Sequence, residues 1–116
     1  MSLAQTFTVK TRERTTCVDV TAQVAEIVRA SGVRRGLCHV MALHATAAIA
    51  INENDDPNIG VDLLTALERM VPDGAGWLHD RIDGNATAHI KAAILGQQET
   101  LAIGRASCRE RVSRCV

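Results

Sequence analysis

The first third of the chain shows alternating and then helical patterns of apolar residues. Alternation predicts one half-buried strand over residues 5–10 and a second over residues 15–20, joined by the polar turn 12–14 as a hairpin. From Thr21, which we expect to cap a helix, apolar residues return every three or four positions until Ser31-Gly32. We therefore expect a hairpin followed by one covering helix.

The middle of the chain predicts two more strands and a longer helix. Apolar runs indicate strands over residues 37–43 and 44–52, with His39 as an ordinary strand residue inside the first. Asp56-Pro57 marks a helix start, and the helix extends to about Met70. The side chains expected on its buried face are Val61, Leu64, Leu67 and Met70.

The last third predicts a loop, a helix and a strand. Residues 73–84 form the loop, Asn85 can cap the helix, and Gly96 ends it. The side chains expected to pack inward from this helix are Ile90, Ala93 and Ile94. Residues 99–102 begin a strand. The order β-β-α-β-β-α-α-β lacks regular βαβ alternation, which favours an α+β fold with a mixed or antiparallel sheet and helices packed on it.

Composition indicates one small domain with an aliphatic core. The 116 residues are 47% hydrophobic, and Phe7 and Trp77 are the aromatic residues. A net charge of zero disfavours nucleic acid and anionic membranes as partners. The chain has no apolar run near the ~20 residues of a membrane span and no signal-peptide pattern. We expect a soluble, cytoplasmic protein.

The cysteines Cys17, Cys38, Cys108 and Cys115 lack CxxC spacing. This pattern predicts neither a disulfide framework nor a thiolate zinc site. Cys17 and Cys38 lie in apolar runs, so we expect them to be buried free thiols.

The composition changes abruptly at about Ile103. Residues 103–116 carry four arginines and two of the four cysteines, without helical or strand periodicity. One interpretation is a basic arm for an anionic partner. However, residues 103–112 resemble the translation of a sequencing adapter. We therefore expect one incomplete domain over residues 1–102 and a non-native tail over residues 103–116.

Two polar clusters carry the candidate chemistry. In the first, His44 and Thr46 precede an apolar segment that ends in amides and carboxylates; the second runs from His79 to Lys91. Burial alone does not explain polar groups at both ends of a strand. We expect the two clusters to meet in space.

Three histidines of these clusters suggest a metal site. His44 begins a predicted strand, His79 lies in a loop and His89 lies on a helix. Three neutral imidazoles from separate elements would bind zinc or a similar divalent ion and leave a position open for water or substrate. The spacing is not HExxH, and three scattered histidines are also compatible with no metal site.

The remaining polar residues have functional and structural interpretations side by side. Glu53 can orient a ligand or shuttle a proton, or it can be a solvated loop residue. Asn85 can bind substrate or cap its helix, and Thr46 can donate to an oxyanion or to the backbone. Arg81 and Lys91 can contact phosphate or point into solvent.

Taken together, the clusters resemble the YjbQ-like family, whose members are described as secondary thiamine-phosphate synthases. The matching segments are residues 44–49, 51–54, 56–57 and 84–91, within a similarity that spans Phe7 to Gly96. The resemblance implies a compact α+β fold, a homotrimer and a histidine-lined site for a divalent metal, with zinc expected. It also implies a transferase that joins a hydroxymethylpyrimidine diphosphate to a thiazole phosphate with release of pyrophosphate, so the partner is a small phosphorylated metabolite.

The resemblance assigns candidate roles position by position. The metal ligands are His44, His79 and His89. The catalytic candidates are Glu53, Asn52 and Thr46. The substrate-binding candidates are Asn85, which matches a family motif position, and Lys91 and Arg81, whose charges could contact phosphate.

Two departures from the family pattern bear on these roles. Ala45 stands where the family usually has threonine, which removes one hydroxyl donor. The family also continues into further C-terminal strands that we expect this chain to lack, leaving an exposed sheet edge. Three alternatives stay open: a non-catalytic metal- or phosphometabolite-binding module, a metal-dependent hydrolase, and an inert fragment.

Overall fold

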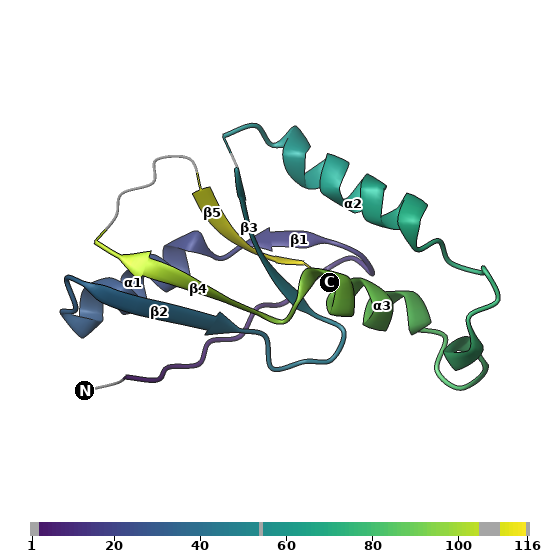
Figure 1. Cartoon of the computed structure of the whole chain (residues 1–116), viewed down its shortest axis with the longest axis horizontal. Helices are drawn as coiled ribbons and strands as arrows, with labels where there is room; N and C mark the ends of the chain where they lie inside the picture. The colour runs from purple at the N-terminus through teal and green to yellow at the C-terminus, as the bar shows by residue number, and fades with distance from the viewer. Residues whose placement is uncertain (1–2, 54, 105–109, 116) are drawn as a thin grey trace.

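The computed structural model describes residues 3–53, 55–104 and 110–115 (Figure 1). In chain order the elements are β1 (Cys17–Asp19), α1 (Thr21–Ser31), β2 (Gly36–Met41), β3 (Ala48–Glu53), α2 (Asn58–Met70), the 3₁₀ helix η1 (Leu78–Arg81), α3 (Ala86–Leu95), β4 (Gln98–Ile103) and β5 (Glu110–Cys115). The protein has the expected α+β fold, with antiparallel strands and helices beside them.

The described strands form two small antiparallel sheets. One has the order β1-β5-β3, and the other pairs β2 with β4. In the second sheet His39 stands opposite Thr100. The predicted hairpin is wrong, because residues 5–10 carry no strand and β1 pairs with β5 instead. Half-buried Val9 nevertheless packs against the core, whereas Phe7, on the same side of the alternation, is exposed.

The last strand corrects a second expectation. Residues 110–115 form β5 although their sequence has no strand periodicity. A strand between two others gains backbone hydrogen bonds along both edges, and these do not depend on side-chain pattern.

Cys17, expected to be a free thiol, is disulfide-bonded; strand register places it opposite Cys115. The non-native origin of residues 103–116 stays a prediction.

Aliphatic side chains form the core, as composition predicted. The buried cluster consists of Val20, Val24, Ala42, Ala47 and Ile49. Half-buried Cys38, Val40 and Leu101 from the two-stranded sheet pack against it. Cys38 is a free thiol, and burial raises its pKa.

Helix α1 ends at Gly32, whose positive φ of 73° is a left-handed conformation that glycine adopts readily.

Helix α2 extends away from both sheets (Figure 1). Of its expected inner face, Leu67 is buried, but Val61 and Met70 are 61% and 62% exposed. The burial expected for these two residues is therefore wrong. Periodicity identified the helix correctly, but these two apolar side chains are not covered.

Helix α3 has the predicted bounds and an unexpected buried face. It follows Asn85 and ends before Gly96. Its buried residues are Ala86, Thr87, Lys91 and Ala92. Ala93 and Ile94, expected inside, are exposed. Among the described residues, no helix is long and apolar enough to cross a membrane.

Candidate functional site

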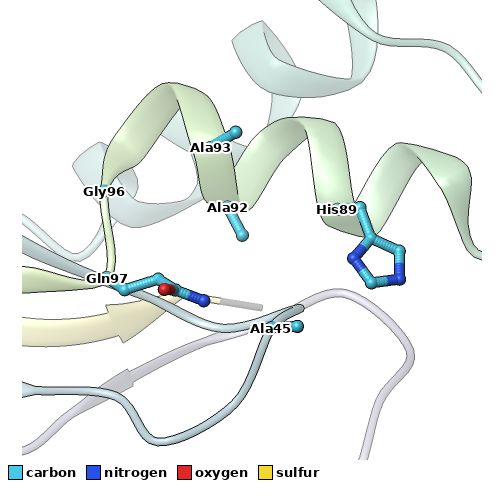
Figure 2. Close-up of a pocket in the computed structure, with 6 residues that line it drawn as sticks. All are labelled: Ala45, His89, Ala92, Ala93, Gly96 and Gln97. Carbon is cyan, nitrogen blue, oxygen red and sulfur yellow. The ribbon is translucent and has the colours of Figure 1, made fainter.

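The two polar clusters meet where helix α3 passes the loop between β2 and β3. Ala45 from this loop and His89 from α3 line one hollow of about 290 Å³, together with Ala92, Ala93, Gly96 and Gln97 (Figure 2). The Gln97 side-chain amide donates to the carbonyl oxygen of His44 at 2.9 Å. Ala45 of the first cluster and His89 of the second therefore lie at one hollow, whereas Gln97, which binds His44, lies outside both clusters.

A second hollow also has His89 in its lining. It measures about 500 Å³ and is lined by Trp77, Leu78, His79, Ala86, His89 and Ile90. Apart from the two imidazoles, its lining is apolar or aromatic. The indole N–H of Trp77 donates to the Pro72 carbonyl at 2.8 Å, which fixes one edge of the ring. His89 thus lines both hollows.

Two of the three expected metal ligands are in contact. The rings of His79, on η1, and His89, on α3, lie edge to face with centroids 5.0 Å apart. His79 Nε2 also lies 3.9 Å from Asp83 Oδ2. This contact joins the short 3₁₀ helix to α3 at the apolar hollow.

His44 has a different environment. It lies in the loop 42–47 rather than at a strand start, because β3 begins at Ala48. The backbone N–H of Thr46 donates to His44 Nδ1 at 3.2 Å, and Thr46 Oγ1 lies 2.9 Å from the same nitrogen. Among the described residues, no group of three or more His, Cys, Asp or Glu side chains is placed to hold a metal. The donors present therefore do not fit the expected three-histidine zinc site.

The acidic segment after β3 is organised as a turn. Glu53 Oε1 accepts from the backbone N–H groups of Asp55 at 2.5 Å and Asp56 at 3.0 Å. Asn52 Oδ1 accepts from Glu53 N at 2.8 Å. Asp56 Oδ1 accepts from Asn58 N at 2.9 Å, at the start of α2. These contacts support the structural interpretation of Asn52 and Glu53, which line neither hollow.

The three substrate-binding candidates also lie outside the two hollows. Lys91 is 5% exposed and forms a salt bridge with Glu68 of α2. Asn85 occupies the N-cap position of α3, but its Oδ1 is buried without a described hydrogen-bond partner. Asp80 accepts the first backbone N–H of the helix instead, at 3.0 Å. Arg81 is exposed on η1.

A polar network fixes the loop 73–84 against α3. Thr87 Oγ1 donates to Asp73 Oδ1 at 2.7 Å. Arg14 lies 3.7 Å from the same carboxylate and donates to the Gly84 carbonyl at 3.3 Å. The Thr87 hydrogen bond, followed by the charges of Arg14 and Lys91, lowers the pKa of Asp73 despite some desolvation. This network positions η1, and with it His79.

Sequence reasoning assigned no role to Trp77 or Gln97. Trp77 is the only tryptophan in the chain and lies in a glycine-rich loop. This combination could have suggested that its ring lines a binding site. Gln97 follows the helix-ending Gly96 directly, but its link to His44 spans 53 positions and leaves no local pattern. His39 is confirmed as an exposed strand residue: its ring nitrogens lie 2.9 Å from Thr100 Oγ1 and 3.1 Å from Gln98 Oε1.

Comparison with known sequences finds one family. The model described as "UPF0047 protein YjbQ-like" matches residues 5–109. A UPF0047 protein of Archaeoglobus fulgidus is 42% identical over 90 residues, which cover 78% of this chain and 68% of that protein. One from Methanothermobacter thermautotrophicus is 35% identical over 99 residues, covering 85% and 68% respectively.

Solved structures agree with this similarity. A YbjQ-like protein of unknown function from Sulfolobus solfataricus P2 has a TM-score of 0.87 and 32% identity, covering 92% of this chain and 80% of its own. A hypothetical protein from Aeropyrum pernix K1 has a TM-score of 0.88 and 33% identity, covering 94% and 84%. The fold therefore agrees with these structures over nearly the whole chain.

Proposed function

The chain belongs to the YjbQ-like UPF0047 family, and from this premise we propose that it is a transferase of the thiamine-phosphate-forming type. In the proposed reaction a thiazole ring nitrogen attacks the methylene carbon of a hydroxymethylpyrimidine diphosphate. The carbon–oxygen bond to the diphosphate breaks, and pyrophosphate leaves with the bonding electrons. Because the ring nitrogen already carries a lone pair, the reaction needs no general base.

The observation that carries this proposal is that His89 lines two hollows. Their volumes, about 290 and 500 Å³, lie near the usual range for small-molecule sites. One ring substrate in each hollow would bring the two reacting atoms together beside His89. Holding both reactants in this way lowers the barrier by removing the entropy cost of their encounter.

The linings of the two hollows differ in a way that suits two different ring substrates. Trp77 and Ile90 offer a flat, apolar surface for a heteroaromatic ring in the larger hollow. In the smaller hollow, the Gln97 side chain lies on the wall opposite α3 (Figure 2). The imidazole of His89 can hydrogen-bond to a ligand from either side and can stabilise charge that develops on the leaving pyrophosphate.

The divalent metal, zinc in the first instance, stays a separate proposal. His79 and His89 would contribute ligands, and the described residues place no third His, Cys, Asp or Glu with them in a metal-binding group. The proposed reaction therefore does not depend on the metal. Metal analysis of the dialysed protein tests it. Assembly as a homotrimer is likewise a proposal, which light scattering tests.

The assay measures thiamine phosphate formed from the two substrates by the purified chain. We expect product with the unaltered chain and a loss of roughly 10²-fold in kcat for His89→Ala, the scale for removing one stabilising donor. His39→Ala is the matched control, because His39 is an exposed histidine on β2 that lines neither hollow.

Circular dichroism must show that both variants fold. Absence of product above the no-enzyme background would refute the proposal, as would equal losses in the two variants. Tight binding of a phosphorylated metabolite without turnover would instead favour a binding module.

A further inference from the structure

The loop that carries His44 is held from two sides. On the α3 side, the Gln97 amide donates to the His44 carbonyl oxygen at 2.9 Å. On the loop side, Thr46 contacts the imidazole through its backbone N–H and its hydroxyl. The side chain itself is exposed, and the next residue, Ala45, lines the smaller hollow. Thr46 therefore fixes the ring, which is accessible to a ligand but is not part of the lining of either hollow.

The contacts of Thr46 define the hydrogen-bonding state of the ring. A backbone N–H can only donate, so His44 Nδ1 must accept through its lone pair. In the neutral imidazole the proton then resides on Nε2. A zinc ligand needs a free lone pair on the coordinating nitrogen. In this arrangement the Nδ1 lone pair is engaged and Nε2 carries hydrogen.

We infer that His44 serves as an Nε2–H hydrogen-bond donor to an anionic phosphate oxygen, and not as a metal ligand. The inference rests on the proposed function for the nature of the anion, which is the diphosphate group of the substrate or the pyrophosphate released. A fixed donor of this kind stabilises negative charge on the leaving oxygen. Consistent with this role, His44 does not join His79 and His89 in a metal-binding group among the described residues.

Two substitutions separate donor from ligand. In His44→Gln the side-chain amide N–H can replace the Nε2–H donor, whereas His44→Ala removes it. With inorganic pyrophosphate as the probe in calorimetry, we expect His44→Ala to weaken binding roughly tenfold or more, as for loss of a hydrogen bond to a charged group. We expect His44→Gln to stay within about threefold of the unaltered chain, because it keeps one such bond.

His39→Ala serves as a further control, because His39 is an exposed histidine on β2 that lines neither hollow. We expect it to leave pyrophosphate binding unchanged. Equal weakening by His44→Gln and His44→Ala would overturn the inference, and so would unchanged binding in His44→Ala.

Nitrogen NMR of ¹⁵N-histidine-labelled protein adds a readout independent of activity. We expect His44, assigned by its disappearance in His44→Gln, to show a protonated Nε2 and an unprotonated Nδ1, both unchanged by added zinc. A proton on Nδ1, or a coordination shift of either His44 nitrogen with zinc, would overturn the inference. If turnover is absent but the pyrophosphate and NMR results hold, the proposed reaction fails and the donor role stands.

Discussion

The salt bridge between Lys91 and Glu68 offers the sharpest test of how the site is supported. Lys91 lies on the buried face of α3, and its side chain is 6% exposed, whereas that of Glu68 on α2 is 42% exposed. Substituting Lys91 and substituting Glu68 should therefore change the free energy of unfolding by different amounts. Glu68→Gln leaves a buried ammonium without its counter-charge, while Lys91→Met replaces the charge with an apolar chain of similar length.

The structure sets the size of this difference. Breaking a fully buried pair from one side costs roughly 3–5 kcal/mol. Because Glu68 is partly exposed and the Asp73 carboxylate also interacts with Lys91, we reduce the expected cost of Glu68→Gln to about 2 kcal/mol. Lys91→Met should cost less than about 1 kcal/mol, and the double variant should resemble Lys91→Met alone.

Urea denaturation followed by circular dichroism measures these free energies of unfolding. Glu26→Gln is the matched control, because it breaks the exposed Glu26–Arg29 pair within α1 and should change stability little. A larger loss for Lys91→Met than for Glu68→Gln would refute the reasoning. It would mean that the ammonium itself stabilises the fold, or that it faces a ligand site as the sequence suggested.

Two further predictions concern stability. Gly32→Ala should destabilise the fold by about 1 kcal/mol because its φ of 73° is strained for alanine, whereas Gly60→Ala inside α2 should be neutral or stabilising by up to about 1 kcal/mol. Stabilisation by Gly32→Ala, or destabilisation by Gly60→Ala, in thermal unfolding would contradict this. Thr87→Val removes the hydrogen bond that contributes most to holding the Asp73 pKa below 3.8. The loss in free energy of unfolding caused by this substitution should therefore be complete above that pH and should shrink as the pH falls through the folded pKa of Asp73. Urea midpoints across this range check it, and a penalty that grows toward acid would be inconsistent with this linkage.

The sequence by itself determined the helices and the aliphatic character of the core, although not every residue that forms it. Helix α1 ends at Gly32, and α3 lies between Asn85 and Gly96. Start and stop signals of this kind act within a few residues, so they can be read locally. The polar residues of the two clusters were also recognisable, because their chemistry is written in the residue types.

Only the tertiary structure decided which segments meet and what each polar side chain does. Strand β5 pairs with β1 and β3. Backbone hydrogen bonds between segments that are distant in sequence form only where the fold brings strand edges together, so they leave no local sequence pattern. Lys91 became a buried ion-pair partner through α2, and His44 Nδ1 was engaged by Thr46. Burial and hydrogen-bond partners are properties of the packed chain, so residue type and spacing could nominate these side chains without assigning their roles.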